Sequence, residues 1–285
     1  METFERTIAP EKKEKGRNCR LKISFLRHAN KADFDPHKGG AISESGLSKK
    51  GEAGSQELGR KNPTDKFFKT YASHLERSQA TIDNVALGMS EGKDDFRKPG
   101  KRIRSQIDAP HFSPAFIAEY RAHFTPKPDN FEELSDDEKE KIVEEMENPG
   151  VEYWIGLWDK KFDEETESAA EIAEKMASYF SHFDKLIGRL KDGSEVDILN
   201  VTHPTAVEPF FLACLKPPFK NIQEMGGPLN LLEDFELLIS TDENGQKGYA
   251  VNFRGKEFGI DLEKVVELNG SYEARMKKNF QEGVE

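Results

Sequence analysis

Strands and helices alternate along the first ninety residues, and this alternation limits the possible folds more than any other feature. Leu21–Leu26 has the alternating apolar pattern of a strand, and Lys69–Ala72 has the pattern of a second, shorter one. Helices are expected from Ser48 to about Arg60 and from Leu75 to about Gly88. A strand–helix–strand–helix order predicts a parallel sheet covered by helices.

The second half of the chain continues this pattern. Thr166–Lys191 carries apolar residues at spacings of three and four, which predicts an amphipathic helix. Val196–Thr202 is an apolar strand, and Asn244-Gly245 predicts a hairpin turn between strands at Phe235–Ser240 and Tyr249–Phe253. We therefore expect an α/β fold, a three-layer α/β/α sandwich with a mostly parallel central sheet and a helical cap insertion.

The cap is expected because the middle of the chain changes in composition. Basic residues concentrate in 93–104, acidic residues in 129–147, and prolines punctuate the region. Both charged runs are interpreted as solvated faces, although the basic run is also placed to attract a phosphorylated substrate. For 285 residues we expect one core with an insertion. The predicted division is a flexible lead-in at 1–18, a core at 19–90 and 166–270, a helical cap at 91–165, and a tail at 271–285.

Charge and cysteine content narrow the classes of partner. The formal net charge of −11 disfavours nucleic-acid binding, because an acidic surface repels phosphate backbones. No apolar stretch is long enough to span a bilayer, so no membrane partner is expected. Cys19 and Cys214 lack metal-ligand spacing and are expected to be reduced thiols of a cytoplasmic protein. The oligomeric state stays open.

Cationic and imidazole side chains follow three of the predicted strands. Arg27 and His28 end the first strand, Arg77 begins the helix after the second, and His203 follows a later strand. Ligands of parallel α/β sheets bind at the carboxyl ends of strands, so these residues are expected to converge. Two guanidinium groups and two imidazoles suit a tetrahedral dianion. The alternatives are an ordinary loop pair, a surface arginine and a structural histidine.

Several short motifs resemble those of one family. L-R-H-A at 26–29 resembles the R-H-G signature of the histidine phosphatase (phosphoglycerate-mutase-like) superfamily. S-H-L-E-R-S-Q-A-T at 73–81 is similar to its S-x-L-x-R-A-x-x-T, and G-L-S-K-K-G at 46–51 to its L-T-x-x-G. V-T-H at 201–203 and A-E-Y at 118–120 resemble the motifs of its second histidine and its acid/base carboxylate. The matches keep the family's order over about residues 20–270.

This resemblance implies a phosphatase that needs no metal or other cofactor and acts on a small phosphorylated substrate. It implies that His28 forms a phosphohistidine and that Glu119 donates a proton to the leaving alcohol. The phosphoryl group would be bound by Arg27, Arg77 and His203. Asn30 and Thr205 are expected to assist in that binding.

Some positions depart from the family pattern. Ala29 replaces a glycine, and its methyl group would crowd the loop if that position needed a positive φ. Pro204 stands where glycine is frequent and has no N–H to donate, so Thr205 is expected to donate instead. Glu208 and Glu44 are the alternatives to Glu119 as proton donor.

Two other functions remain open beside the phosphatase. A phosphoglycerate-type phosphomutase would use the same residues, but the family's mutases carry a glycine, an acidic residue and a Trp-Asn pair after the first histidine. Here Ala29-Asn30-Lys31 and Asp33-Phe34 stand in their place. The third hypothesis is a non-catalytic module that binds a phosphorylated ligand, and the complete Arg27, His28, Arg77 and His203 set disfavours it.

Overall fold

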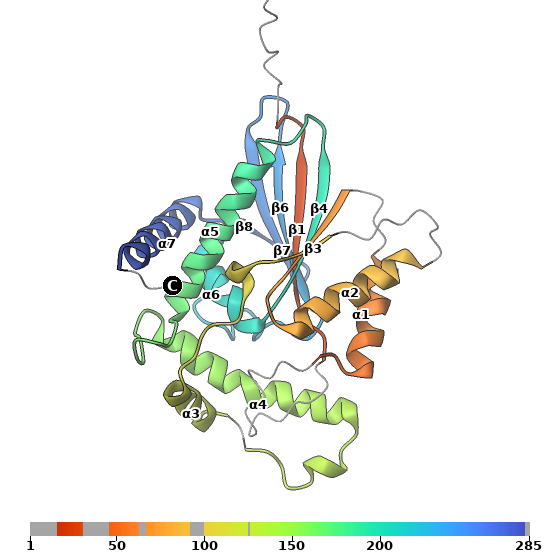
Figure 1. The fold of residues 1–285 in the computed structure, drawn as a ribbon, viewed down its shortest axis with the longest axis vertical. Helices are drawn as coiled ribbons and strands as arrows, with labels where there is room; N and C mark the ends of the chain where they lie inside the picture. The colour runs from red at the N-terminus through yellow and green to blue at the C-terminus, as the bar shows by residue number, and fades with distance from the viewer. Residues whose placement is uncertain (1–15, 31–45, 63–66, 92–99, 125, 283–285) are drawn as a thin grey trace, which may run out of the picture.

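The computed structural model describes residues 16–30, 46–62, 67–91, 100–124 and 126–282 (Figure 1). The first half contains β1 (Arg20–Arg27), α1 (Lys49–Lys61), β2 (Phe67–Ala72), α2 (Glu76–Ser90), β3 (Lys101–Ile103), the short 3-10 helices η3 (Ser105–Ile107) and η4 (Phe131–Glu133), α3 (Pro114–Ala122) and α4 (Asp136–Leu157). The second half contains α5 (Ala169–Ile187), β4 (Glu195–Thr202), α6 (Pro204–Cys214), β5 (Leu215–Lys216), β6 (Asp234–Thr241), β7 (Lys247–Phe253), β8 (Lys256–Ile260) and α7 (Leu262–Glu282).

Within the described residues, eight strands form one mixed sheet in the order β3-β2-β4-β1-β6-β7-β8-β5. The β3, β2, β4 and β1 strands are parallel, whereas the four pairings from β1 to β5 are antiparallel. The expectation of a mostly parallel sheet is therefore wrong. Short connections in the second half of the chain favour antiparallel pairing. The turn at Gly245, with φ of 79°, joins β6 and β7 as a hairpin, and the two strands of a hairpin are necessarily antiparallel.

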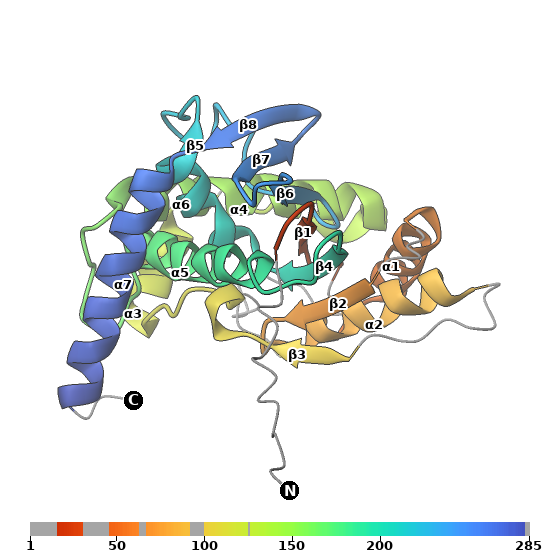
Figure 2. The same ribbon diagram turned by 90° about the horizontal axis from the view of Figure 1, so that it is seen from above.

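Helices cover both faces of the sheet, which confirms the three-layer α/β/α arrangement (Figure 2). On one face Leu21, Ile23 and Phe25 of β1 pack with α5 and α6 in the main core. On the other face Leu26 packs with residues of α2. Side chains of a strand alternate between the two faces, so a central strand such as β1 supplies both cores.

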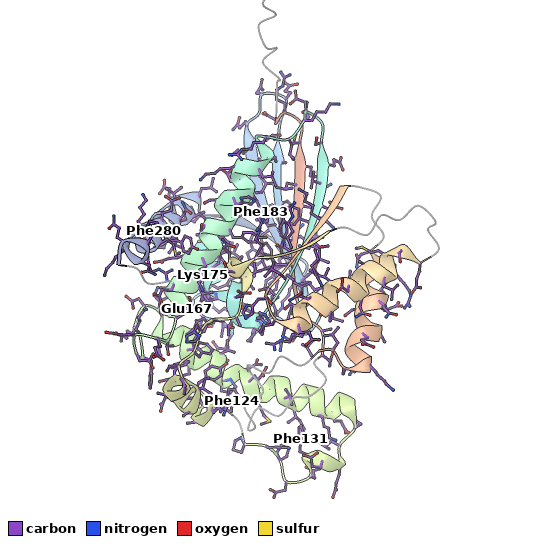
Figure 3. The ribbon with its side chains drawn as sticks, in the orientation of Figure 1. Phe124, Phe131, Glu167, Lys175, Phe183 and Phe280 are labelled. Carbon is purple, nitrogen blue, oxygen red and sulfur yellow. The ribbon has the colours of Figure 1, made fainter. Side chains whose placement is uncertain are left out.

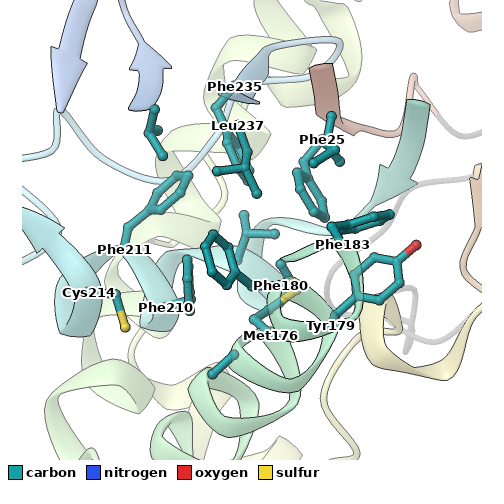
Figure 4. Packing of buried hydrophobic residues seen from close by; sticks show 14 of the residues in the cluster. Phe25, Met176, Tyr179, Phe180, Phe183, Phe210, Phe211, Cys214, Phe235 and Leu237 are labelled. Atoms are coloured by element: carbon teal, nitrogen blue, oxygen red, sulfur yellow. The ribbon is translucent and has the colours of Figure 1, made fainter. Parts of the chain in front are cut away.

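Aromatic rings fill the larger core (Figure 4). Phe25 of β1 stacks on Phe235 of β6 with ring centroids 4.7 Å apart. Phe211 of α6 meets Phe235 edge-on at 4.3 Å. Because both contacts cross between elements far apart in the sequence, they hold β1 and its carboxyl end in a defined place.

Local capping determines where the helices begin. Ser48 accepts a hydrogen bond from the Gly51 N–H over 3.1 Å, as expected for the start of α1. Capping boxes open α4 at Ser135 and α5 at Ser168.

The structure places parts of the predicted divisions differently. Lys101–Ile103, inside the predicted cap, forms the edge strand β3 of the sheet, and the helical part begins only at Pro114. Gly16, inside the predicted lead-in, donates its N–H to the Leu190 carbonyl over 2.8 Å. The α7 helix runs through the predicted tail, where Arg275 contacts Glu171 of α5 at 3.1 Å.

The α3 and α4 helices, which we call the α3–α4 segment (residues 114–157), lie beyond the carboxyl ends of β1 and β4 (Figure 1). No helix within the described residues is long and apolar enough to cross a bilayer.

Candidate active site

A cavity of about 1130 Å³ lies where the parallel strands end and the α3–α4 segment begins. The four residues predicted from strand ends all line it, namely Arg27, His28, Arg77 and His203. Each of the four is more than nine-tenths buried, although ionisable side chains are rarely buried without a chemical reason. The predicted convergence of these residues is therefore present in the fold.

The His28 ring has a defined orientation and tautomer. Its Nδ1 lies 2.8 Å from the Ala29 carbonyl oxygen, and a carbonyl only accepts, so Nδ1 carries the proton. Its Nε2 accepts a hydrogen bond from Nε of Arg77 over 3.1 Å. The lone pair of His28 is thus on Nε2, assigned from these hydrogen-bond partners.

The surroundings of His28 favour its neutral form. Burial holds the pKa of His28 well below its usual value, and the nearby His203, Arg77 and Arg27 lower it further. The hydrogen bond to Ala29 acts in the opposite direction. A neutral imidazole is the form that can act as a nucleophile.

Arg77 links the two imidazoles. Its Nη2 lies 3.4 Å from Nδ1 of His203, and the ring centroids of His28 and His203 are 5.0 Å apart. Burial lowers the pKa of Arg77 to about 10, so the guanidinium stays charged near neutral pH. Arg77 stands in the first turn of α2, where backbone N–H groups and the helix dipole favour an anion.

His203 is held from its other side by two serines. Ser73 Oγ lies 2.8 Å and Ser78 Oγ 3.4 Å from its Nε2. If Nδ1 accepts from Arg77, Nε2 carries the proton and donates it to Ser73. Ser73 was not predicted as a site residue, although it begins the S-x-L-x-R motif that carries Arg77.

Arg27 connects the sheet to the α3–α4 segment. Its Nη1 donates to the Leu229 carbonyl over 2.6 Å, and its Nη2 lies 3.6 Å from Oε2 of Glu147. Glu147 comes from α4, lines the cavity and is partly buried. A carboxyl group that the sequence interpretation placed on a solvated helix exterior is therefore part of the site.

A sequence signal for Glu147 existed. Val143 and Val151 stand four residues before and after it, and both line the same cavity. Residues four apart share one helix face, so an acidic residue inside an apolar stripe marks a carboxylate facing inward.

The predicted proton donors lie elsewhere. The Glu119 side chain is exposed and does not line the cavity, because residue 119 stands on the outer face of α3. Glu208 is fully buried on α6 and does not line the cavity either, while its Oε1 accepts the Leu229 N–H over 3.0 Å. Burial raises the pKa of Glu208 to about 7. Glu44 lies outside the described residues.

The loop after His28 accommodates Ala29. Ala29 has no positive φ, so the condition under which its methyl group would crowd the loop is not met, and its N–H donates to Thr81 Oγ1 over 3.0 Å. Gly51 lets α1 approach this loop, since a Cβ there would lie 2.3 Å from the Asn30 carbonyl oxygen. Asn30 and Thr205 both line the cavity, as expected for residues near the bound group. Within the described residues, no three His, Cys, Asp or Glu side chains are grouped as metal ligands would be.

No family model matches the chain, and no curated protein sequence matches it. Similar solved structures include a phosphoglycerate mutase from Bacillus anthracis str. Sterne, with 12% identity, a TM-score of 0.49, and coverage of 89% of this chain and 98% of that one. YhfR from Bacillus stearothermophilus has 14% identity and a TM-score of 0.49, covering 83% of this chain and 97% of that one. A mycobacterial glucosyl-3-phosphoglycerate phosphatase has 15% identity and a TM-score of 0.44, covering 81% of this chain and 97% of that one. At these identities and scores the likenesses carry no argument about activity.

Proposed function

We propose that this protein is a phosphatase of the histidine phosphatase superfamily, which hydrolyses a phosphomonoester through a phosphohistidine on Nε2 of His28. One observation carries the proposal: a buried, neutral imidazole presents Nε2 beside the guanidinium of Arg77 inside a cavity. A nucleophile held next to a fixed cation is suited to phosphoryl transfer.

In the first step Nε2 of His28 attacks phosphorus, and the bond from phosphorus to the ester oxygen breaks. A substrate oxygen would replace Nε2 of His28 as the partner of Arg77. Another would replace the Glu147 carboxylate as the partner of Arg27. Once the phosphoryl group replaces His203 as the partner of Arg77, the His203 tautomer with its proton on Nδ1 would donate to a phosphoryl oxygen, while Ser73 Oγ donates to Nε2. These groups stabilise the charge on the equatorial oxygens of the transition state.

The leaving alcohol needs a proton, and we assign its delivery to Glu147 in place of Glu119. Glu147 would donate as the carboxylic acid, after the phosphoryl group has displaced it from Arg27, and would recover its proton in the second step. Glu147 reaches Arg27, whereas Glu119 points away from the cavity. In the second step Glu147 takes a proton from water, the water oxygen attacks phosphorus, and the bond from phosphorus to His28 breaks. Free phosphate and the original imidazole result.

Metal independence and a small phosphorylated substrate belong to the same proposal. Arg27 and Arg77 supply the positive charge that a divalent ion supplies in other phosphatases. A cytoplasmic location is proposed because Cys19 and Cys214 are buried free thiols.

The test is phosphate release from a panel of phosphomonoesters with and without a chelator. We expect release that the chelator leaves unchanged. Turnover confined to a phosphoglycerate pair with a bisphosphate primer would indicate a mutase instead. Binding of phosphate with no turnover of any ester would indicate a non-catalytic module.

A further inference from the structure

The cavity is much larger than a phosphate group needs, and its walls differ in character. Its cationic end holds Arg27, Arg77 and the two histidines. The α3–α4 segment and its flanks contribute seven apolar or aromatic residues, together with the charged Arg121, Lys139 and Glu147. The seven are Phe112, Ile117, Tyr120, Phe124, Phe131, Val143 and Val151. We call these seven residues the aromatic wall; Figure 3 labels Phe124 and Phe131 in this part of the molecule.

The aromatic wall directly adjoins the phosphate end. Glu147, 3.6 Å from Arg27, stands between Val143 and Val151 on α4. The Tyr120 ring is buried, and both Glu147 and Arg27 act electrostatically on its hydroxyl group. A substrate whose phosphoryl group meets Arg27 therefore places its alcohol portion against this wall.

Packing holds the wall in place. Tyr120 meets Phe124 edge-on with centroids 5.1 Å apart, and Phe112 meets Trp154 edge-on at 5.5 Å. Gly150 lets Phe124 lie against α4, since a Cβ at residue 150 would fall 2.4 Å from that ring. A wall that is already packed needs little reorganisation to receive a ligand.

In the remaining arm of the cavity, five charged side chains are paired with one another. Glu171 pairs with Lys161 at 2.9 Å and with Arg275 at 3.1 Å, while Glu167 pairs with Lys175. Figure 3 labels Glu167 and Lys175 near the start of α5. Because these side chains already have partners of opposite charge, they do not favour the binding of a charged group of the ligand.

We infer that the preferred substrates are phosphomonoesters of alcohols carrying a bulky aromatic group, which packs against the aromatic wall. This inference rests on the proposed phosphatase function. Transfer of an aromatic group from water to a contact with Phe124 and Ile117 lowers the free energy of binding. The hydroxyl groups of a sugar or glycerate would lose water against Phe124 and Ile117 without gaining hydrogen bonds from these two side chains, and that loss is costly.

The test compares 2-phenylethyl phosphate with ethyl phosphate, because both leave as primary alcohols of similar acidity. We expect kcat/KM to be at least about 30-fold higher for the phenylethyl ester, as burial of a phenyl ring predicts. Turnover of both esters at similar kcat/KM overturns the inference and leaves the phosphatase proposal intact.

Binding of the matching phosphonates separates the two proposals. 2-Phenylethylphosphonate should bind at least about tenfold more tightly than ethylphosphonate in calorimetric titrations. If no ester is hydrolysed, the phosphatase proposal fails, and this ratio still decides the inference. Equal affinities overturn it.

A matched pair of variants locates the effect. Ile117→Asn puts a polar group into the aromatic wall and should lower the kcat/KM ratio of the two esters at least about fivefold. Ala118→Asn makes the same change at the next residue of α3, which is exposed and outside the cavity lining, and should leave the ratio unchanged. Equal ratios in both variants and the wild type overturn the inference.

Discussion

Nε of Arg77 donates to Nε2 of His28 over 3.1 Å, so the cation contacts the atom that would attack phosphorus. Burial, His203 and this contact all favour the neutral imidazole, and the contact fixes the lone pair of Nε2 toward Arg77. Until a substrate binds, Nε2 of His28 accepts the hydrogen bond that Arg77 would otherwise donate to a substrate oxygen. When a substrate binds, Arg77 has to donate to the phosphoryl group instead. Nucleophile and anion-binding group are thus held as one unit by β1 and α2.

Replacing the nucleophile should remove the chemistry and leave the fold. His28→Ala is expected to lower phosphate release by at least about 10⁴-fold, because no other described imidazole points Nε2 at the same place. Rapid quenching of the wild type in alkaline detergent should trap a phosphoenzyme that later treatment with acid hydrolyses and that the variant lacks. His182→Gln, outside the cavity lining, serves as the control. A wild type that forms no phosphoenzyme in a single turnover contradicts the mechanism.

Two carboxamide variants distinguish Glu147 from Glu119. Glu147→Gln should slow hydrolysis of an alkyl phosphate by about 10²-fold or more, and of 4-nitrophenyl phosphate by much less, because nitrophenolate leaves without a proton. Glu119→Gln should change both rates less than about twofold, as its side chain is exposed. Initial rates with the two substrates provide the measurement. Equal losses on both esters in Glu147→Gln would remove that residue as the acid.

The depressed pKa of His28 has a direct spectroscopic consequence. As pH falls through 6.5, the ring should stay neutral, because burial and the neighbouring cations disfavour imidazolium. Nitrogen-15 shifts of labelled histidines give the protonation state, and the resonance missing from His28→Gln identifies the residue. Half-protonation at pH 6.5 or above contradicts this prediction.

Glu208 should make stability depend on pH. Its pKa rises from 4.5 to about 7 on folding, so the folded state holds the proton more tightly than the unfolded chain. The contribution of Glu208 to the free energy of unfolding is fully present below about pH 4.5. It is lost as the pH rises to about 7, and the loss is at most about 3 kcal/mol.

Urea unfolding of Glu208→Gln at several pH values measures this contribution. The amide keeps an oxygen for the Leu229 N–H and does not titrate. The stability of the variant relative to the wild type should therefore increase between about pH 4.5 and 7 and level off above that range. A constant difference across this range would falsify the assignment.

Residues at strand ends allowed much of the site to be predicted from the sequence. Arg27, His28, Arg77 and His203 adjoin strands or helices whose local patterns are clear, and parallel strands bring such ends to one edge. This convergence can be predicted without knowing which residues of neighbouring strands pair with each other. The local caps at Ser48 and Ser135 were predictable for the same reason, because they depend on neighbours a few residues away.

Tertiary packing decided the remainder. The β6–β7 hairpin is local, but only tertiary packing sets β6 antiparallel against β1 and so extends the sheet with antiparallel strands, which made the prediction of a mostly parallel sheet wrong. The carboxyl group at the site is Glu147 because α4 turns that face toward Arg27, whereas Glu119 lies on the outer face of α3. Helical periodicity specifies which residues share a face of a helix. Only packing of α4 against α3 and α5 specifies which face meets the cavity, because burial of a helix face depends on residues outside the helix.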